Sequence, residues 1–210
     1  MTLISVIIPT VTGREDHYQR CVHAYQERTA SQVELITELN HSSCGLAWQA
    51  GLAYVKGKYI HLTCDDIEPG QDWDVPAIEA VEQGFLPAPQ VCDPNGYPHS
   101  HPQVGVLGAD WTPVHMSALP FTSVAQMKKI APLLTSHYFS DDWVSWRGQQ
   151  AGWSCRLRSG YRFTHHYAQH LRGAGMSEPE RMRHDEALYH QAQVMAEAGQ
   201  WTQPWPLEGR

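Results

Sequence analysis

The sequence predicts an α/β fold in which helices flank a mostly parallel central sheet. Short runs of β-branched residues alternate with segments whose apolar residues recur every three or four positions. The connections between these segments are short, which favours strand–helix–strand units with parallel strands. Two adjacent carboxylates, Asp65 and Asp66, follow directly after the third run, and open α/β sheets bind their ligands at such strand ends.

Length and composition are those of one globular domain, or of a domain with a short extension. The chain has 210 residues, 42% of them hydrophobic, and a formal net charge of −7. The acidic balance argues against a protein that coats nucleic acid, although it is compatible with a local basic groove. The cysteines include no CxxC pair, which favours a reducing compartment and a cytoplasmic location. No segment approaches the length of a membrane span, so we expect none.

Each element of the first half follows from its residue pattern. Residues 3–8 form an apolar, β-branched run that stops at Pro9, which predicts a first strand. In residues 14–29, Cys21 and Tyr25 share one face at helical spacing with Tyr18 and Val22. The same reasoning predicts strands at residues 33–39 and 58–63, and a helix at residues 45–55 with Leu46, Trp48, Leu52 and Val55 in the core.

Further elements are predicted beyond Trp73. A Pro- and His-rich passage at residues 86–102 contains the turn signal Asn95-Gly96, so an excursion or a hairpin is expected there. Ser140 is the expected N-cap of a helix at residues 141–151. The other expected elements are helices at residues 75–83, 124–134 and 180–198, a strand at residues 104–109, and a strand pair formed by residues 153–157 and 161–165.

The adjacent carboxylates are the strongest candidate site. Asp65 and Asp66 carry like charges that repel each other, and a nearby cation gives them a reason to coexist. Hard oxygen ligands suit Mg²⁺ or Mn²⁺, and such an ion can neutralise a diphosphate. The alternative is a pair that faces solvent or caps the following turn.

Five short segments occur in a characteristic order along the chain. They are Ile4-Ser5-Val6-Ile7-Ile8-Pro9-Thr10, Gly45-Leu46-Ala47-Trp48-Gln49-Ala50-Gly51-Leu52, Cys64-Asp65-Asp66, Asp141-Asp142-Trp143 and His170-Leu171-Arg172-Gly173-Ala174-Gly175-Met176-Ser177. Their order resembles that of the motifs in the GT-A glycosyltransferases, especially the family-2-like branch. Cys64-Asp65-Asp66 matches the DXD position of that family.

The resemblance implies a fold, a reaction and a donor. It implies a single GT-A (Rossmann-like) domain over residues 1–177, followed by a C-terminal helix and tail at residues 178–210 that pack on the domain or form a homodimer contact. It also implies a metal-dependent glycosyltransferase that moves a sugar from a nucleotide-diphosphate sugar, with a UDP-sugar favoured, to a hydroxyl acceptor. Inversion at the sugar carbon is the expected stereochemistry.

The resemblance assigns a role to each candidate site residue. Asp142 is the candidate general base, and Asp141 is its neighbour in the first turn of the same helix, where acids also serve as caps. Asp66 and His170 are the candidate ligands of Mn²⁺ or Mg²⁺, with His165 and His166 as rivals of His170. The candidate donor-binding residues are Pro9, Thr10, Thr12, Arg14, Glu38, Gly45, Gln49 and Asp65.

The chain departs from the family pattern at three places. Cys64 replaces the first acid of the DXD motif, and a thiol is a poor substitute for a carboxylate towards Mg²⁺. Trp48 and Gln49 stand where the family has Arg and Asn. The second strand ends in Glu38-Leu39-Asn40 instead of a pair of aspartates, which leaves the donor base open.

Two other functions are compatible with these residues. A metal-dependent hydrolase would use Asp65, Asp66, His165, His166 and His170, although no compact motif such as HExxH is present. A non-catalytic module would keep the fold and bind the nucleotide sugar without turnover. For a transferase, the acceptor class stays open between a protein, a glycan, a small molecule and a modified nucleic acid.

Overall fold

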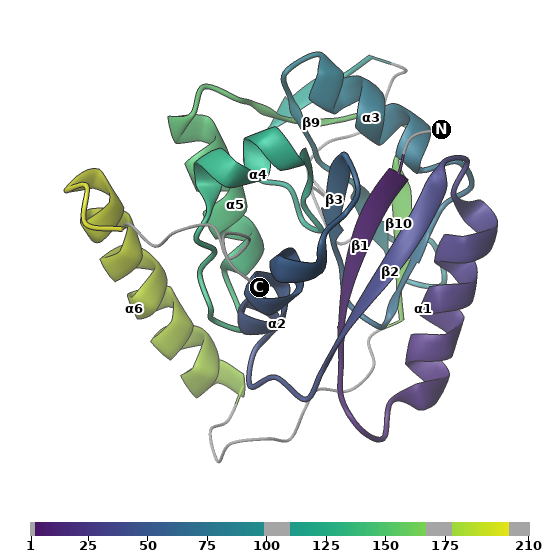
Figure 1. Cartoon of the computed structure of the whole chain (residues 1–210), viewed down its shortest axis with the longest axis horizontal. Coiled ribbons are helices and arrows are strands. Elements are labelled where there is room, and N and C mark those ends of the chain that lie inside the picture. The colour runs from purple at the N-terminus through teal and green to yellow at the C-terminus, as the bar shows by residue number, and fades with distance from the viewer. Residues whose placement is uncertain (1–2, 99–109, 167–177, 202–210) are drawn as a thin grey trace.

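The computed structural model describes residues 3–98, 110–166 and 178–201. A central sheet has the strand order β2-β1-β3-β8, in which β1 pairs in parallel with both β2 and β3 and β8 pairs antiparallel with β3 (Figure 1). Two smaller sheets have the orders β4-β10-β6 and β5-β9-β7. The strands are β1 (Leu3–Thr10), β2 (Gln32–Leu39), β3 (Tyr59–Leu62), β4 (Ile67–Pro69), β5 (Leu86–Pro87), β6 (Gln90–Cys92), β7 (Thr112–Val114), β8 (Phe121–Ser123), β9 (Cys155–Leu157) and β10 (Arg162–His165).

Helices lie on both faces of the central sheet, and a last helix lies outside them (Figure 1). They are α1 (Glu15–Arg28), α2 (Cys44–Gly51), α3 (Asp74–Glu82), α4 (Val124–Ile130), α5 (Ser140–Gln150) and α6 (Glu178–Glu197), with a 3₁₀ turn, η1 (Leu52–Tyr54), after α2. None of the helices in the described part of the chain is both long and apolar enough to span a bilayer.

The two faces of β1 build two separate cores. Ile4 packs in a cluster with Tyr25 of α1 and with Trp73, which directly precedes α3. Ile7, on the opposite face, packs in a cluster with Trp48 of α2 and with residues of α4 and α5. Because both faces are buried, β1 and β3 are mostly apolar, as expected of the inner strands of a parallel sheet, and Ser5 and His61 are buried polar exceptions.

The predicted α/β class, with a central sheet flanked by helices and a C-terminal helix, is confirmed. The first three strands and α1 lie within two residues of their predicted bounds. The helix predicted at residues 45–55 ends at Gly51 and continues only as η1, and Leu46 is exposed instead of being in the core. Leu46 lies on the face of α2 that points away from the sheet.

The second half of the chain differs from the sequence prediction in three places. The helix predicted at residues 124–134 ends at Ile130, because Pro132 has no amide hydrogen to continue it. Ser140 is not an N-cap: Phe139 occupies that position with a left-handed φ of 65°, and the Ser140 hydroxyl donates to the carbonyls of Leu134 and Ser136.

The third correction concerns strand pairing. The segments predicted as a strand pair do form β9 and β10, but β9 pairs with β5 and β7, whereas β10 pairs with β4 and β6. The two strands therefore belong to different sheets, and Gly160 turns the chain between them. The strand predicted at residues 104–109 and the end of the chain at residues 202–210 lie outside the described residues.

Candidate functional site

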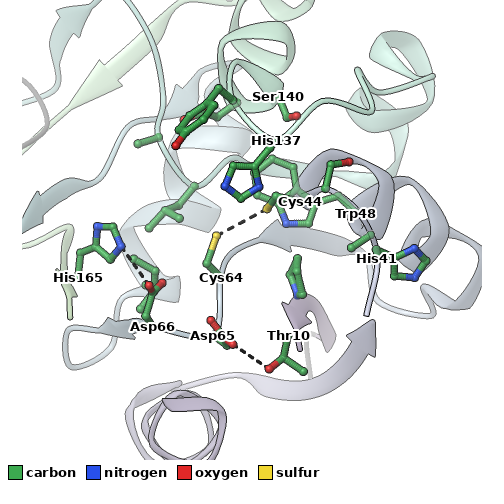
Figure 2. Close-up of a pocket in the computed structure, with 18 of the residues that line it drawn as sticks. Thr10, His41, Cys44, Trp48, Cys64, Asp65, Asp66, His137, Ser140 and His165 are labelled. Atoms are coloured by element: carbon green, nitrogen blue, oxygen red, sulfur yellow. Dashed lines mark hydrogen bonds and ion pairs between the residues drawn. The ribbon is translucent and has the colours of Figure 1, made fainter. Parts of the chain in front are cut away.

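A cavity of about 660 Å³ lies at the carboxyl ends of β1, β2 and β3 (Figure 2). Pro9 and Thr10 line it from the end of β1, and Glu38 lines it from the end of β2. The segment that follows β3 and the start of α5 complete this part of the wall. Parallel strands end at a common edge, so polar residues that are distant in sequence meet there.

The three residues after Thr63 point in three different directions within this cavity (Figure 2). The thiol of Cys64 lies 3.7 Å from the sulfur of Cys44. The carboxylate of Asp65 accepts a hydrogen bond of 2.8 Å from the Thr10 hydroxyl. The carboxylate of Asp66 lies 3.4 Å from Nε2 of His165 on β10.

The guanidinium of Arg14 is the cation that joins the two carboxylates. Its Nε donates to Oδ2 of Asp65 at 2.9 Å, and its Nη2 contacts Oδ1 of Asp65 at 2.6 Å and Oδ2 of Asp66 at 3.1 Å. Asp65 and Asp66 are only 4% and 7% exposed, so these interactions are poorly screened by water. Repulsion within the pair is therefore offset by a group from the start of α1.

The two carboxyl groups respond differently to this environment. Burial raises the pKa of Asp65, although Thr10 and Arg14 act in the opposite direction. Burial also acts to raise the pKa of Asp66, but the hydrogen bond and charge of His165, followed by those of Arg14, lower it to about 2. Asp66 is therefore ionised over the whole physiological range and available to a cation.

We expect Arg14→Gln to lower the free energy of unfolding by about 3 kcal/mol in metal-free buffer, because a buried carboxylate pair loses its counter-ion. Mn²⁺ should then raise the Tm of this variant more than that of the parent, since the ion no longer competes with a guanidinium. Differential scanning calorimetry with and without Mn²⁺ measures both effects. Arg20→Gln is the matched control, because Arg20 is exposed and its ion pair with Glu68 is long, at 3.9 Å. If Mn²⁺ raised the Tm of both variants equally, competition between the ion and the Arg14 guanidinium would be refuted.

A second carboxylate pair enters the cavity from the first turn of α5. Asp141 accepts a hydrogen bond of 3.1 Å from the amide of Asp142, and both residues line the cavity. Burial raises the pKa of Asp141, and the charge of Asp142 adds to this effect. Burial also raises the pKa of Asp142, whereas the charge of His115 lowers it. A carboxylate with a raised pKa is a stronger base than an exposed one.

The pKa of Asp141 has a consequence for stability. A carboxyl group whose pKa is raised by folding contributes most stability below its ordinary pKa, and this contribution is lost as the pH rises through the raised value. Asparagine cannot ionise, so we expect Asp141→Asn to gain about 2–4 °C in Tm over the parent at about pH 8, and less at about pH 5. Thermal melts of both proteins across this range test the prediction. A gain that is independent of pH would contradict it.

The structure brings most of the predicted site residues together. Pro9, Thr10, Arg14, Glu38, Asp65, Asp66, Asp141 and Asp142 all line the cavity, and so does His165. Thr12, Gly45 and Gln49 do not line it. The amide of Thr12 donates to Asn40, and Oε1 of Gln49 accepts from the amide of Leu133 at 2.7 Å. His170 lies outside the described residues, as do residues 171–177 and the pair His99 and His101.

Gly45 has a packing role in the structure. A Cβ at this position would lie 2.1 Å from the carbonyl oxygen of Leu134, which is closer than any real contact. The amide of Gly45 also donates to the carbonyl of Ser136 at 3.0 Å. The glycine therefore lets α2 approach the segment that leads into α5, and it positions one wall of the cavity against the other.

Several cavity residues were missed by sequence reasoning. His41 follows β2, Cys44 begins α2, and His137 lies in the connection to α5 (Figure 2). Other missed residues are mostly apolar and include Met116, Ala118, Leu119, Tyr138, Phe139 and Met182. Their positions carry no recognisable spacing, so only the tertiary structure could place them at the cavity. Leu119 and Phe139 have left-handed φ values of 56° and 65°, which is rare for large apolar residues.

Two side chains of the cavity are of the kinds that bind a divalent cation. Among residues 3–98, 110–166 and 178–201, no group of three or more His, Cys, Asp or Glu side chains is arranged to hold a metal ion. Asp66 and His165 nevertheless face each other and supply one carboxylate and one imidazole. Such a partial set suits Mg²⁺ or Mn²⁺, which commonly take their remaining ligands from water and from substrate phosphates.

Two solved structures share the fold of this chain. No protein-family model and no curated protein matches the sequence. The structure of GalNAc-T7 with UDP, GalNAc and Mn²⁺ superposes with a TM-score of 0.67 at 14% identity, over 98% of this chain and 52% of that one. The structure of TarS from S. aureus superposes with a TM-score of 0.59 at 11% identity, over 94% of this chain and 42% of that one. The chain thus spans about half the length of these two proteins, both GT-A-type glycosyltransferases. The order of the strands, the flanking helices and these superpositions together show that the chain has the GT-A fold.

Proposed function

We propose that this protein is a metal-dependent glycosyltransferase that moves a sugar from a nucleotide-diphosphate sugar, with a UDP-sugar favoured, to a hydroxyl acceptor with inversion. One observation carries the proposal: a single cavity joins the carboxylate pair after β3 to the carboxylate pair at the start of α5. The first pair suits a cation and a diphosphate, and the second suits a general base. The GT-A fold and the UDP and Mn²⁺ in the GalNAc-T7 structure support this reading.

The donor is proposed to bind at the ends of β1 and β2. Thr10 and Glu38 offer a hydroxyl and a carboxylate at this edge, and Arg14 offers a guanidinium. Asp65 is fixed by Thr10 and Arg14, so its carboxylate is already oriented to accept hydrogen bonds from a ribose. Because these side chains are positioned before the donor arrives, little ordering entropy is lost on binding.

Asp66 and His165 would hold the divalent cation, with His170 as a further candidate from the sequence. The bound cation would stabilise the negative charge that develops on the leaving diphosphate. Asp66 is suited to this position because its carboxylate is ionised and buried, so that its charge is poorly screened by water. His165 is a neutral ligand when deprotonated, and it also fixes the orientation of the Asp66 carboxylate.

Asp142 is proposed to accept the proton of the acceptor hydroxyl as this attacks the sugar carbon. Its carboxylate lies in the first turn of α5, and burial raises its pKa, which makes it a stronger base than an exposed carboxylate. Asp141 accepts the amide hydrogen of Asp142 and so helps to fix the turn. This arrangement leaves the Asp142 side chain as the group that faces the acceptor.

We also propose that residues 178–210 form a C-terminal helix and tail that pack on the domain, with α6 beside the cavity. Met182 of α6 lines the cavity, and the carboxylate of Asp185 accepts hydrogen bonds of 3.0 Å from the amides of His137 and Tyr138. Tyr189 of the same helix stacks on Phe139, with ring centroids 5.7 Å apart. The extension thus supports the segment that leads into α5.

Calorimetric titration of UDP, GDP, TDP and CDP, each with and without Mn²⁺, tests the proposed function. Binding of one nucleotide that requires Mn²⁺ supports a transferase and names the donor class. If no nucleotide binds under any metal condition, the proposal fails. Turnover of a bound nucleotide sugar by water alone, without any gain from a panel of hydroxyl acceptors, would favour the hydrolase instead. Binding without any turnover would favour a non-catalytic module.

A further inference from the structure

Two cysteines face each other across the wall of the cavity (Figure 2). Cys44 is the first residue of α2, and Cys64 follows β3 directly before Asp65. Their sulfur atoms are 3.7 Å apart, close to van der Waals contact. A disulfide needs a separation of about 2.05 Å, so the sulfurs have to approach by about 1.7 Å. Movement on this scale is within reach of side-chain rotation together with a small shift of a loop.

The two thiols differ from the other cysteines in their access to small molecules. Cys44 and Cys64 are partly exposed and line the cavity, whereas Cys21, Cys92 and Cys155 are buried and do not line it. Cys64 also directly precedes Asp65 and Asp66, so its thiol lies beside the carboxylates that are proposed to serve the donor and the cation. A reagent that enters the cavity therefore meets two neighbouring thiols.

We propose that Cys44 and Cys64 form a two-thiol modification site inside the cavity, which a hydroperoxide converts into a disulfide. In the first step, one thiol sulfur attacks the terminal oxygen of the hydroperoxide, and the O–O bond breaks to give a sulfenic acid and water or an alcohol. In the second step, the other thiol attacks the sulfenic sulfur, and the sulfenic oxygen leaves as water while the S–S bond forms. The two thiols lose two electrons and two protons, and the hydroperoxide takes up both.

The disulfide would change the position of the carboxylates next to it. Cys64 is held between Thr63, whose carbonyl accepts a hydrogen bond of 2.9 Å from Nε1 of Trp48, and Asp65, which is tied to Arg14. Drawing Cys64 towards α2 pulls the start of the Asp65–Asp66 segment away from Arg14 and His165. We therefore expect the disulfide form to bind the Mn²⁺–nucleotide pair about tenfold or more weakly, a consequence that rests on the proposed function.

The first test is chemical and does not depend on that function. The full-length protein is treated with hydrogen peroxide, its free thiols are alkylated, and its peptides are analysed by mass spectrometry without reduction. We expect a linked pair of peptides containing Cys44 and Cys64, with alkylation of neither residue, and full recovery of both thiols after reduction. In Cys44→Ser the linked pair is absent, and Cys64 is recovered in alkylated or sulfenic form.

Two results would overturn the proposal. One is folded protein whose Cys44 and Cys64 remain fully alkylated after peroxide treatment, and the other is oxidation confined to bonds between different molecules. Circular dichroism of Cys44→Ser and of Cys64→Ser confirms that each variant is folded, so that a missing link reports on chemistry.

The second test separates the modification from the proposed function. Nucleotide binding with Mn²⁺ is measured on the reduced protein, on the oxidised protein and on oxidised protein after reduction. Weaker binding that is restored by reduction, and is absent in Cys44→Ser, supports the coupling. If the linked peptides form but the reduced protein binds no nucleotide, the modification site stands and the proposed function fails.

Discussion

Replacing Asp142 with Asn should lower the rate of sugar transfer by about 10²- to 10⁴-fold while leaving donor affinity unchanged. The amide has nearly the same shape as the carboxylate but cannot accept the proton of the attacking hydroxyl. Asp142 lines the cavity at the start of α5 and makes no contact with Arg14, Asp65 or Asp66 among the hydrogen bonds and ion pairs described above. The measurement is the release of nucleoside diphosphate from the donor, together with the donor Kd by calorimetry.

Asp141→Asn is the matched control for this prediction. Its side chain supports the turn by accepting the amide hydrogen of Asp142, and an asparagine oxygen can do the same. We expect a loss of transfer of less than about tenfold in Asp141→Asn. If Asp141→Asn abolished transfer and Asp142→Asn did not, Asp141 would be the base. If neither variant lost activity, general base catalysis from this helix would be refuted.

The second large effect is expected at the other carboxylate pair. Asp66→Ala should weaken Mn²⁺-dependent nucleotide binding by about 100-fold, which corresponds to about 2.7 kcal/mol, and should leave any metal-independent binding unchanged. The reason is that Asp66 offers an ionised carboxylate to the cation, with its pKa lowered to about 2 by His165 and Arg14 against the effect of burial. Calorimetric titration of the nucleotide in Mn²⁺ and in a chelator separates the two contributions.

Glu68→Ala provides a carboxylate control close to Asp66 in the sequence. Glu68 is paired with Arg28 at 3.2 Å and with His166 at 2.8 Å, and it does not line the cavity. We expect this variant to keep the Mn²⁺-dependent affinity of the parent. Equal losses in Asp66→Ala and Glu68→Ala would point to a general structural effect. Unchanged binding in Asp66→Ala would exclude this carboxylate as a ligand.

The central part of the fold could be predicted because its signals are strong and local. β1 and β3 appear in the sequence as short, mostly apolar runs. α1 places Cys21 and Tyr25 on one buried face, so its apolar residues recur at helical spacing. The short strands β4, β7 and β8 have three residues each, too few to show a period. Their identity depends on partners that are distant in the sequence, such as His165 for Ile67.

The candidate site was predictable to the extent that it lies at strand ends. Thr10 and Asp65 follow predicted strands, Glu38 lies at the end of one, and the parallel arrangement brings all three to one edge. The direction of the Gln49 side chain could not be predicted, because it depends on the tertiary position of α2. In the structure its Oε1 accepts a hydrogen bond from the amide of Leu133 and does not enter the cavity. Cys44 gave no signal on its own, since its importance comes only from its distance to Cys64.

The buried carboxylate of Asp185 gives α6 a measurable connection to the cavity. Because it accepts the amide hydrogens of both His137 and Tyr138, these amides are protected from exchange while α6 stays packed on the domain. Hydrogen–deuterium exchange at these two positions would therefore report the opening free energy of the C-terminal helix, without any label on the helix itself. An acceptor that contacts Met182 would slow this exchange, so the same two amides could serve as a detector in a search for the acceptor.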